Sequence, residues 1–174
     1  MDLTTSVLIA VAIVASVLLQ FGERRMNVWR ALLPLGIVGW VGVKYLTPFP
    51  TAGNDLLFEL TGAALGVVTG VIAAVLTGVR RDGQGNVLLT AGVIYAAYWI
   101  AIFGARIAVA LAATNSPDFD RQLGLFSYQH DITGPAAWTA FFVLQAIMMV
   151  GVRTVIVLVR AILVQPRLNQ RLAA

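Results

Sequence analysis

The chain contains no cysteine and has little charge for its size. It holds a single histidine, His130, among 174 residues. Disulfides, thiolate metal sites and cysteine nucleophiles are therefore excluded, as are sites built from several histidines of one chain. Charged residues make up only 11% of the sequence, whereas roughly a quarter of a soluble domain is charged. No sequence motif identifies a cofactor.

Apolar residues, by contrast, are too numerous to be hidden from water in so short a chain. Hydrophobic residues account for 59% of the sequence and the mean hydropathy is +0.86. Small domains leave much of their surface exposed, so the sequence predicts an all-α integral membrane bundle in contact with lipids. The net charge of +4 comes from basic residues beside apolar runs, which is typical of membrane proteins and excludes nucleic acid as a partner.

Apolar runs predict five transmembrane helices in a single domain that covers residues 1–174. A spanning helix needs about 20 mostly apolar residues, and the second run is the shortest of the five. Asp-Gly and Gly-Asn pairs predict a tight turn over 80–86 between the third and fourth helices. The predicted spans are 3–21, 31–48, 56–79, 87–112 and 134–159, with a loop over 113–133.

Basic residues on alternate sides of these spans predict the orientation. They cluster after the first span, in the turn between the third and fourth spans, and in the tail. The positive-inside rule then places the N-terminus outside and the C-terminus in the cytoplasm of a bacterium, in its plasma membrane. The first run follows Asp2 rather than a basic segment, which favours a retained span over a signal peptide. The marker residues are Arg24, Arg25, Arg30, Arg80, Arg81, Arg160, Arg167 and Arg171.

Small residues at helical spacing predict two packing faces, because close contact of small residues drives helix association in lipid. Either face can serve packing within the chain or contact with a partner chain. The fourth-helix face is expected to pack on the third helix, which turns Trp99 and Arg106 towards another helix, a cavity or a partner. The fifth helix aligns Gln145, Met149 and Arg153 on one face. The position of Arg153 inside the span is explained by its side chain reaching the cytoplasmic interface, which is called snorkelling. The two faces are Gly62, Gly66 and Gly70, and Ala97, Ala101 and Gly104.

Three ionisable residues inside the spans share one predicted depth near the outer side, and such residues are functional candidates. One interpretation is a structural ion-pair network around Glu59. Another is a polar pocket whose excess positive charge receives an anion, a lipid phosphate or a carboxylate. A third is a proton relay through Glu59. The candidate pocket residues are Lys44, Glu59, Arg106, Trp99, Tyr95 and, above them, Asp131.

The loop over 113–133 carries Phe119, Leu123 and Phe126 at helical spacing. This spacing predicts a short interfacial helix across the bundle mouth, broken near Gly124, that acts as a lid or a docking surface. The alternative is a solvated loop with a few anchoring aromatic residues.

The middle of the chain, from Arg24 to Arg106, resembles the CcdC-like small membrane proteins of bacteria. The resemblance implies a compact helical bundle in the plasma membrane and no agreed biochemical activity. The long 113–133 loop and the long basic fifth helix depart from the family. The resemblance is carried by the arginines after the first span, the glycine-spaced third helix, the Arg81-Asp82-Gly83 turn, and Tyr95, Trp99 and Arg106.

Three functions follow from these features. The first is a non-catalytic membrane subunit that packs against and supports a larger complex, since the chain is small and has several small-residue faces. The second is a small homo-oligomeric transporter, or a protein that binds a ligand or lipid in the predicted pocket. The third and least favoured is an enzyme acting on lipid-linked substrates, because no nucleophile or metal motif is present. The expected partners are lipids and either other membrane subunits or copies of this chain.

Overall fold

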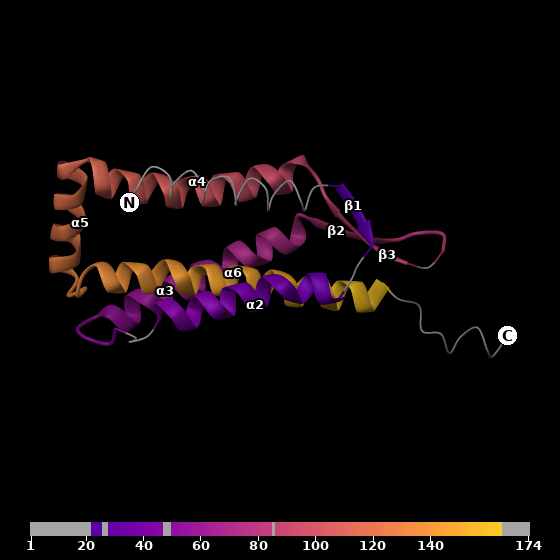
Figure 1. Ribbon diagram of the computed structural model, residues 1–174, viewed down its shortest axis with the longest axis horizontal. Helices are drawn as coiled ribbons and strands as arrows, with labels where there is room; N and C mark the ends of the chain where they lie inside the picture. The colour runs from indigo at the N-terminus through magenta and orange to yellow at the C-terminus, as the bar shows by residue number, and fades with distance from the viewer. Residues whose placement is uncertain (1–21, 26–27, 47–49, 85, 165–174) are drawn as a thin grey trace.

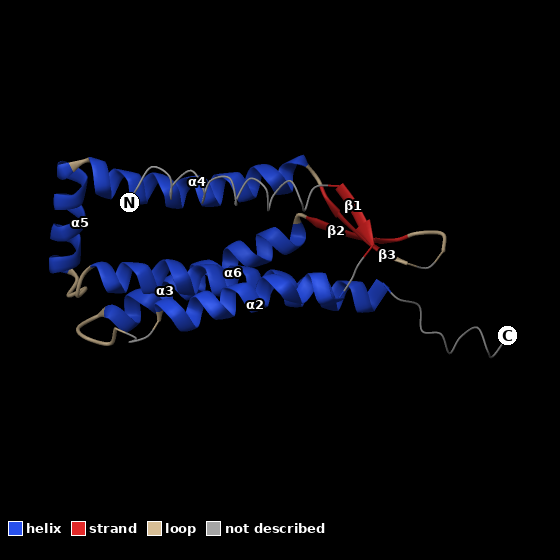
Figure 2. Cartoon of the chain, in the orientation of Figure 1, coloured by secondary structure: helices blue, strands red, loops and turns tan. Residues whose placement is uncertain are grey.

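The protein is described by a computed structural model that covers residues 22–25, 28–46, 50–84 and 86–164, and it is mostly helical (Figure 2). The predicted first span, 3–21, lies outside the described residues. The elements in chain order are β1 (Gly22–Arg25), α2 (Val28–Tyr45), α3 (Asp55–Val75), β2 (Thr77–Arg81), β3 (Val87–Ala91), α4 (Val93–Asn115), α5 (Pro117–Gln129) and α6 (Pro135–Val164).

Three of the described helices, α3, α4 and α6, are long and apolar enough to cross a membrane. They contain 21, 23 and 30 residues, and at about 1.5 Å per residue each reaches the ~30 Å of a hydrocarbon core. The apolar part of α2 is shorter and runs over Pro34–Lys44. These helices agree with a membrane protein.

Helices α3 and α6 run parallel and form the closest helix pair (Figure 1). The glycine face of α3 makes this approach possible. A Cβ atom on Gly66 would lie 2.5 Å from the carbonyl oxygen of Gln145, and one on Gly70 would lie 2.7 Å from that of Met149. Since these distances are too short for real contacts, only glycine lets the two backbones come so near. The predicted face Gly62, Gly66 and Gly70 therefore lies against α6 of the same chain.

Helix α2 lies along one side of this pair, α4 lies on the other side, and α5 crosses one end (Figure 1). Helix α2 packs antiparallel on α6, where Gly42 faces Ile147. Between them lies an open apolar groove of about 390 Å³ that Gly39 and Gly151 help to line. Helix α4 runs antiparallel to α3 and α6, and Tyr98 Oη donates a hydrogen bond to the Thr69 carbonyl oxygen at 2.8 Å.

A small antiparallel sheet corrects the predicted helix boundaries. Residues 77–81 and 87–91 form a hairpin, and β1 pairs with β3 to give the order β1-β3-β2. The predicted helices over 56–79 and 87–112 instead end at Val75 and begin at Val93. Short apolar runs with β-branched residues look alike in a helix and in a strand, and pairing with β1 supplies the extra strand that stabilises the hairpin.

The hairpin turn is organised by Asp82. Its Oδ1 accepts hydrogen bonds from the backbone N–H groups of Gln84, at 2.9 Å, and Asn86, at 2.8 Å. Asn86 Nδ2 donates to Oδ2 at 2.9 Å. These bonds, the largest cause being that from the Asn86 side chain, hold the pKa of Asp82 below its usual value. Glu23 on β1 forms an ion pair with Arg80 on β2.

Helix α5 lies across the end of the bundle opposite the sheet (Figure 1). It runs unbroken through Gly124, so the prediction of a break there is wrong. Ser116 Oγ accepts from the Phe119 N–H and Pro117 begins the helix, which is a favourable N-terminus. The helix is anchored to α6 because Trp138 Nε1 donates a 3.0 Å hydrogen bond to Ser127 Oγ.

Candidate polar site between helices α4 and α6

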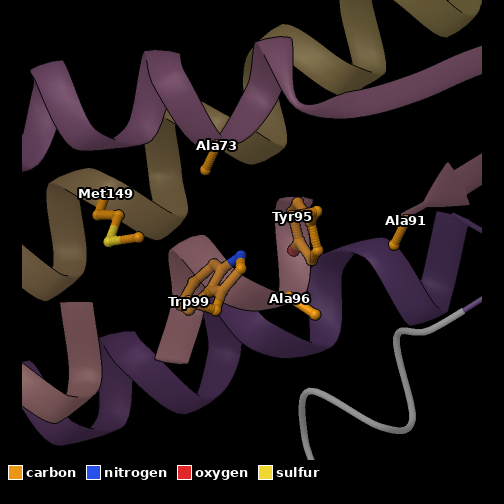
Figure 3. Close-up of a cluster of buried hydrophobic side chains, with 6 residues drawn as sticks. All are labelled: Ala73, Ala91, Tyr95, Ala96, Trp99 and Met149. Carbon is orange, nitrogen blue, oxygen red and sulfur yellow. The ribbon is translucent and has the colours of Figure 1, made fainter. Parts of the chain in front are cut away.

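A row of aromatic side chains lines the face of α4 that turns into the bundle. Tyr95 and Trp99 are 2% and 8% exposed, and their ring centroids are 6.0 Å apart. Phe103 continues the row by stacking on Trp99 at 5.3 Å. Residues three or four apart share one face of a helix. Figure 3 shows Tyr95 and Trp99 projecting between the helices, close to Met149 of α6 and Ala73 of α3.

An arginine lies at each end of this aromatic row. Arg106 of α4 is 5.9 Å from the Phe103 ring centroid, and Arg153 of α6 is 5.2 Å from that of Tyr95. Both distances lie within the range of cation–π attraction. The two guanidinium groups lie at different depths in the bundle. Arg106 bonds to Gln145 of α6, and Gln145 and Arg153 are about 12 Å apart along that helix.

Each arginine has one buried donor, its Nε–H group, that no described residue accepts. Arg106 Nη2 donates a 2.8 Å hydrogen bond to Oε1 of Gln145, but its buried Nε has no partner in the described chain. The buried Nε of Arg153 likewise has none. No carboxylate within the described ranges forms an ion pair with either group. A guanidinium carries five donors that match carboxylate or phosphate oxygens, so the site has donor capacity for an anion.

The sequence-predicted pocket is therefore only partly assembled. Arg106, Trp99 and Tyr95 come together, but Lys44 and Asp131 do not join them. Lys44 is exposed at the end of α2, with Nζ 5.3 Å from the Trp40 ring centroid. Asp131 is exposed in the turn after α5, where its φ is +54° and its carbonyl oxygen accepts from the Asn54 N–H.

Glu59 lies away from the arginines, at the contact between α3 and α6. It is fully buried, and it forms no ion pair with Lys44 or Arg106. The expected ion-pair network around Glu59 is thus wrong for the described residues. The reason is rotational: Glu59 shares the α3 face of Gly62, which turns towards α6, whereas Arg106 reaches Gln145 from the other helix.

The small-residue face of α4 points away from the bundle, contrary to the expectation that it packs on α3. Ala97, Ala101 and Gly104 are exposed, and a Cβ atom on Gly104 would meet no atom of the described residues within 4 Å. The aromatic face of α4 packs inward instead. Its larger side chains bury more surface and make more dispersion contacts against Met149 than alanine would.

Two residues of the site were not singled out as pocket residues from the sequence. Gln145 and Arg153 lie on one predicted face of the fifth helix, but snorkelling explained Arg153 equally well. The signal that identifies them is their shared face with Met149 at spacings of four. Arg160 continues that face and has a structural task, since its Nη1 donates to the carbonyl oxygens of Ala74 and Thr77 at 2.7 and 2.9 Å.

No group of three or more His, Asp or Glu side chains that could hold a metal ion occurs in the part of the chain that the structure describes. Comparison with family models, with curated proteins and with solved structures found no match to this chain. The resemblance to the CcdC-like proteins therefore stays a prediction.

Proposed function

We propose that this chain is a multi-pass protein of a bacterial plasma membrane that binds an anionic ligand, with a carboxylate or phosphate group, between α4 and α6. Arg106 contacts the anion, Gln145 positions the guanidinium, and Trp99 and Phe103 hold the apolar part of the ligand. The observation that carries the proposal is the pair of arginines, Arg106 and Arg153, placed inside apolar helices with unsatisfied buried donors.

A charge inside a membrane span is costly when no opposite charge pairs with it, and ionisable residues in such spans mark ligand or ion sites. An anion that accepts hydrogen bonds from Arg106 would offset this cost. The surrounding aromatic rings favour an amphiphile over a bare inorganic ion. The ligand source is either an acidic lipid or a small carboxylate or phosphate compound, and both offer the same oxygen acceptors to the guanidinium.

The orientation is part of the proposal. The sheet and the turn between its strands carry Arg25, Arg80 and Arg81, and the end of α6 with Arg160 lies near the same side of the bundle (Figure 1). The positive-inside rule assigns that side to the cytoplasm. Helix α5 then covers the outer end, and Arg106 lies closer to the outer side than Arg153 does.

Binding is tested with purified protein in a neutral detergent. Brominated phosphatidylglycerol is titrated in while tryptophan emission is followed, because bromine quenches a nearby indole such as that of Trp99. We expect Arg106→Gln to weaken binding at least about tenfold, since hydrogen bonds to charged groups contribute roughly 1.5–3 kcal/mol. The matched control is Arg121→Gln, which removes an exposed arginine of α5.

Further arms separate the possible sources of the anion. Brominated phosphatidylcholine measures contact with a lipid of no net charge. Decanoate and inorganic phosphate are added as competitors, and displacement by either indicates a small anion rather than a lipid headgroup. Equal affinities of Arg106→Gln and Arg121→Gln for every anionic probe would contradict the proposed site.

The second candidate is an accessory subunit that supports a larger membrane complex. It is favoured by the exposed face of Ala97, Ala101 and Gly104, because such faces let helices of two chains approach closely. Under this proposal, mild detergent extracts the chain in a larger assembly, and Gly104→Leu reduces the assembly to a monomer. An unchanged size for Gly104→Leu would argue against this face as the contact.

A further inference from the structure

Glu59 differs from every other acidic residue that the structure describes, because it is fully buried and its carboxyl oxygens also have no hydrogen-bond partner. Its exposed fraction is 0%, and neither Oε1 nor Oε2 has a hydrogen-bond partner among the described residues. Asp55, one helical turn earlier, is also 0% exposed but is satisfied. Its carboxylate accepts from the Thr133 N–H at 2.8 Å and from Thr133 Oγ1. The two carboxyl groups therefore require different explanations.

The α3 residues next to Glu59, Phe58 and Gly62, contact an apolar side chain of α6. Gly62, on the same face as Glu59, touches Phe141 of α6, and Phe58 stacks on that ring with centroids 4.6 Å apart. The facing stretch of α6, 135–152, contains no charged residue. Among the described residues, the titratable groups at this end of the helix pair include Asp55 on α3, Tyr128 on α5, and His130 and Asp131 in the turn that bonds to Asn54.

We propose that Glu59 is a proton-binding carboxyl group inside the membrane-spanning part of the bundle, separate from the Arg106 site. An ionised carboxylate without a donor or a cation is strongly disfavoured in an apolar interior. A bound proton removes the charge without requiring any neighbouring ligand. Mg²⁺ and Ca²⁺, in contrast, require about six or more oxygen ligands, and the described residues provide no group of three acidic or histidine side chains.

The proton site does not depend on the proposed anion site. Glu59 lies on the α3–α6 contact, whereas Arg106 meets α6 from α4 at Gln145. Along α6, Gln145 lies one turn beyond Phe141. Glu59 and Arg106 form no ion pair with each other. Loss of anion binding in Arg106→Gln therefore says nothing about Glu59, and the two proposals can fail separately.

Native membranes that contain the full chain provide the first test. Dicyclohexylcarbodiimide is an apolar reagent that adds the O–H of a protonated carboxyl group across its C=N bond. The O-acylisourea then rearranges to a stable N-acylurea without loss of atoms. We expect peptide mass spectrometry to find one adduct on Glu59 in the wild type and none in Glu59→Gln. The Asp55→Asn variant is the matched control and keeps the adduct.

Infrared spectroscopy provides a second readout that does not depend on access of the reagent. The difference spectrum of wild type minus Glu59→Gln is expected to contain the C=O stretching band of a carboxylic acid. The Asp55→Asn spectrum is expected to retain this band, because Glu59 is unchanged in that variant. Carboxylate bands at Glu59 in place of the acid band, or an undiminished adduct yield in Glu59→Gln, would overturn the proposal.

Discussion

Gly66→Ala is the most direct test of how the bundle is held together. The added Cβ would lie 2.5 Å from the Gln145 carbonyl oxygen and 3.0 Å from its Cα, whereas ordinary contacts are 3.4–4 Å. These are backbone atoms of a helix, so no side-chain rotation relieves the clash. Helices α3 and α6 must separate by about 1 Å, and a gap of that size forfeits roughly a quarter to a half of the dispersion attraction across it.

The expected cost follows from this displacement. Overpacking of this kind costs about 1–3 kcal/mol, and in lipid no hydrophobic gain compensates for a lost helix contact. Alanine also favours the helix over glycine by roughly 1 kcal/mol. Gly104→Ala is the matched control, because no atom in the described part of the chain lies within 4 Å of its added Cβ. The propensity terms cancel, so the two variants should differ by about 1–3 kcal/mol.

The assay is unfolding in mixed micelles of a mild detergent and sodium dodecyl sulfate, followed by far-ultraviolet circular dichroism. The free energy of unfolding is compared between Gly66→Ala, Gly104→Ala and the wild type. We expect Gly104→Ala to be as stable as the wild type or more stable, and Gly66→Ala to be less stable than both. Equal free energies for the two variants would refute the close parallel contact of α3 with α6.

Two further predictions concern residues outside the arginine site. Asp55→Ala should lower the free energy of unfolding by about 1–3 kcal/mol, because Thr133 loses both of its bonds to the carboxylate. The exposed Asp118→Ala is its control in the same micelle assay, and equal losses in both variants would contradict the stated role of Asp55. Since hydrogen bonds hold the pKa of Asp82 below its ordinary value, the hairpin should keep its full stability above the ordinary aspartate range and lose it on acidification through the lowered pKa. Amide exchange protection of residues 77–91 measures this loss, which Asp82→Asn should abolish, and an unchanged pH dependence in that variant would be the contrary result.

The packing of α3 illustrates how far local patterns reach. The spacing of Gly62, Gly66 and Gly70 predicts a face for close helix contact from the 3.6-residue period alone. The spacing does not identify the partner helix, because several predicted helices offer small or adaptable residues. The contact with Gln145 and Met149 of α6 depends on how all the helices pack at once.

Helix α4 illustrates where local patterns mislead. Two faces are visible in its sequence, and the face of small residues was expected to pack inward. The structure turns the aromatic face of Tyr95 and Trp99 inward and leaves Gly104 exposed. In a membrane both faces are tolerated on the outside, because lipid accepts alanine, glycine and aromatic rings alike. Composition therefore cannot decide the rotation of such a helix.

The sheet illustrates a limit of periodicity. The uncharged residues at the ends of the third and fourth predicted helices have no pattern that separates a strand from a helix end. The partner strand β1 lies more than 60 positions away from β3 along the chain. Pairing between such distant segments is a tertiary contact, and it cannot be predicted from either segment alone.

The amino-acid sequence alone predicts a lipid environment for the protein, because the excess of apolar residues is visible in the composition without any knowledge of the fold. It also establishes the long apolar segments and the helical face of each ionisable residue, because both depend only on neighbours along the chain. Which faces meet is decided by the tertiary structure, in which Arg106 reaches Gln145 while Glu59 remains enclosed without a partner. A helix can be rotated about its axis at little cost in lipid, so only the packing of all the helices together selects which charges come into contact.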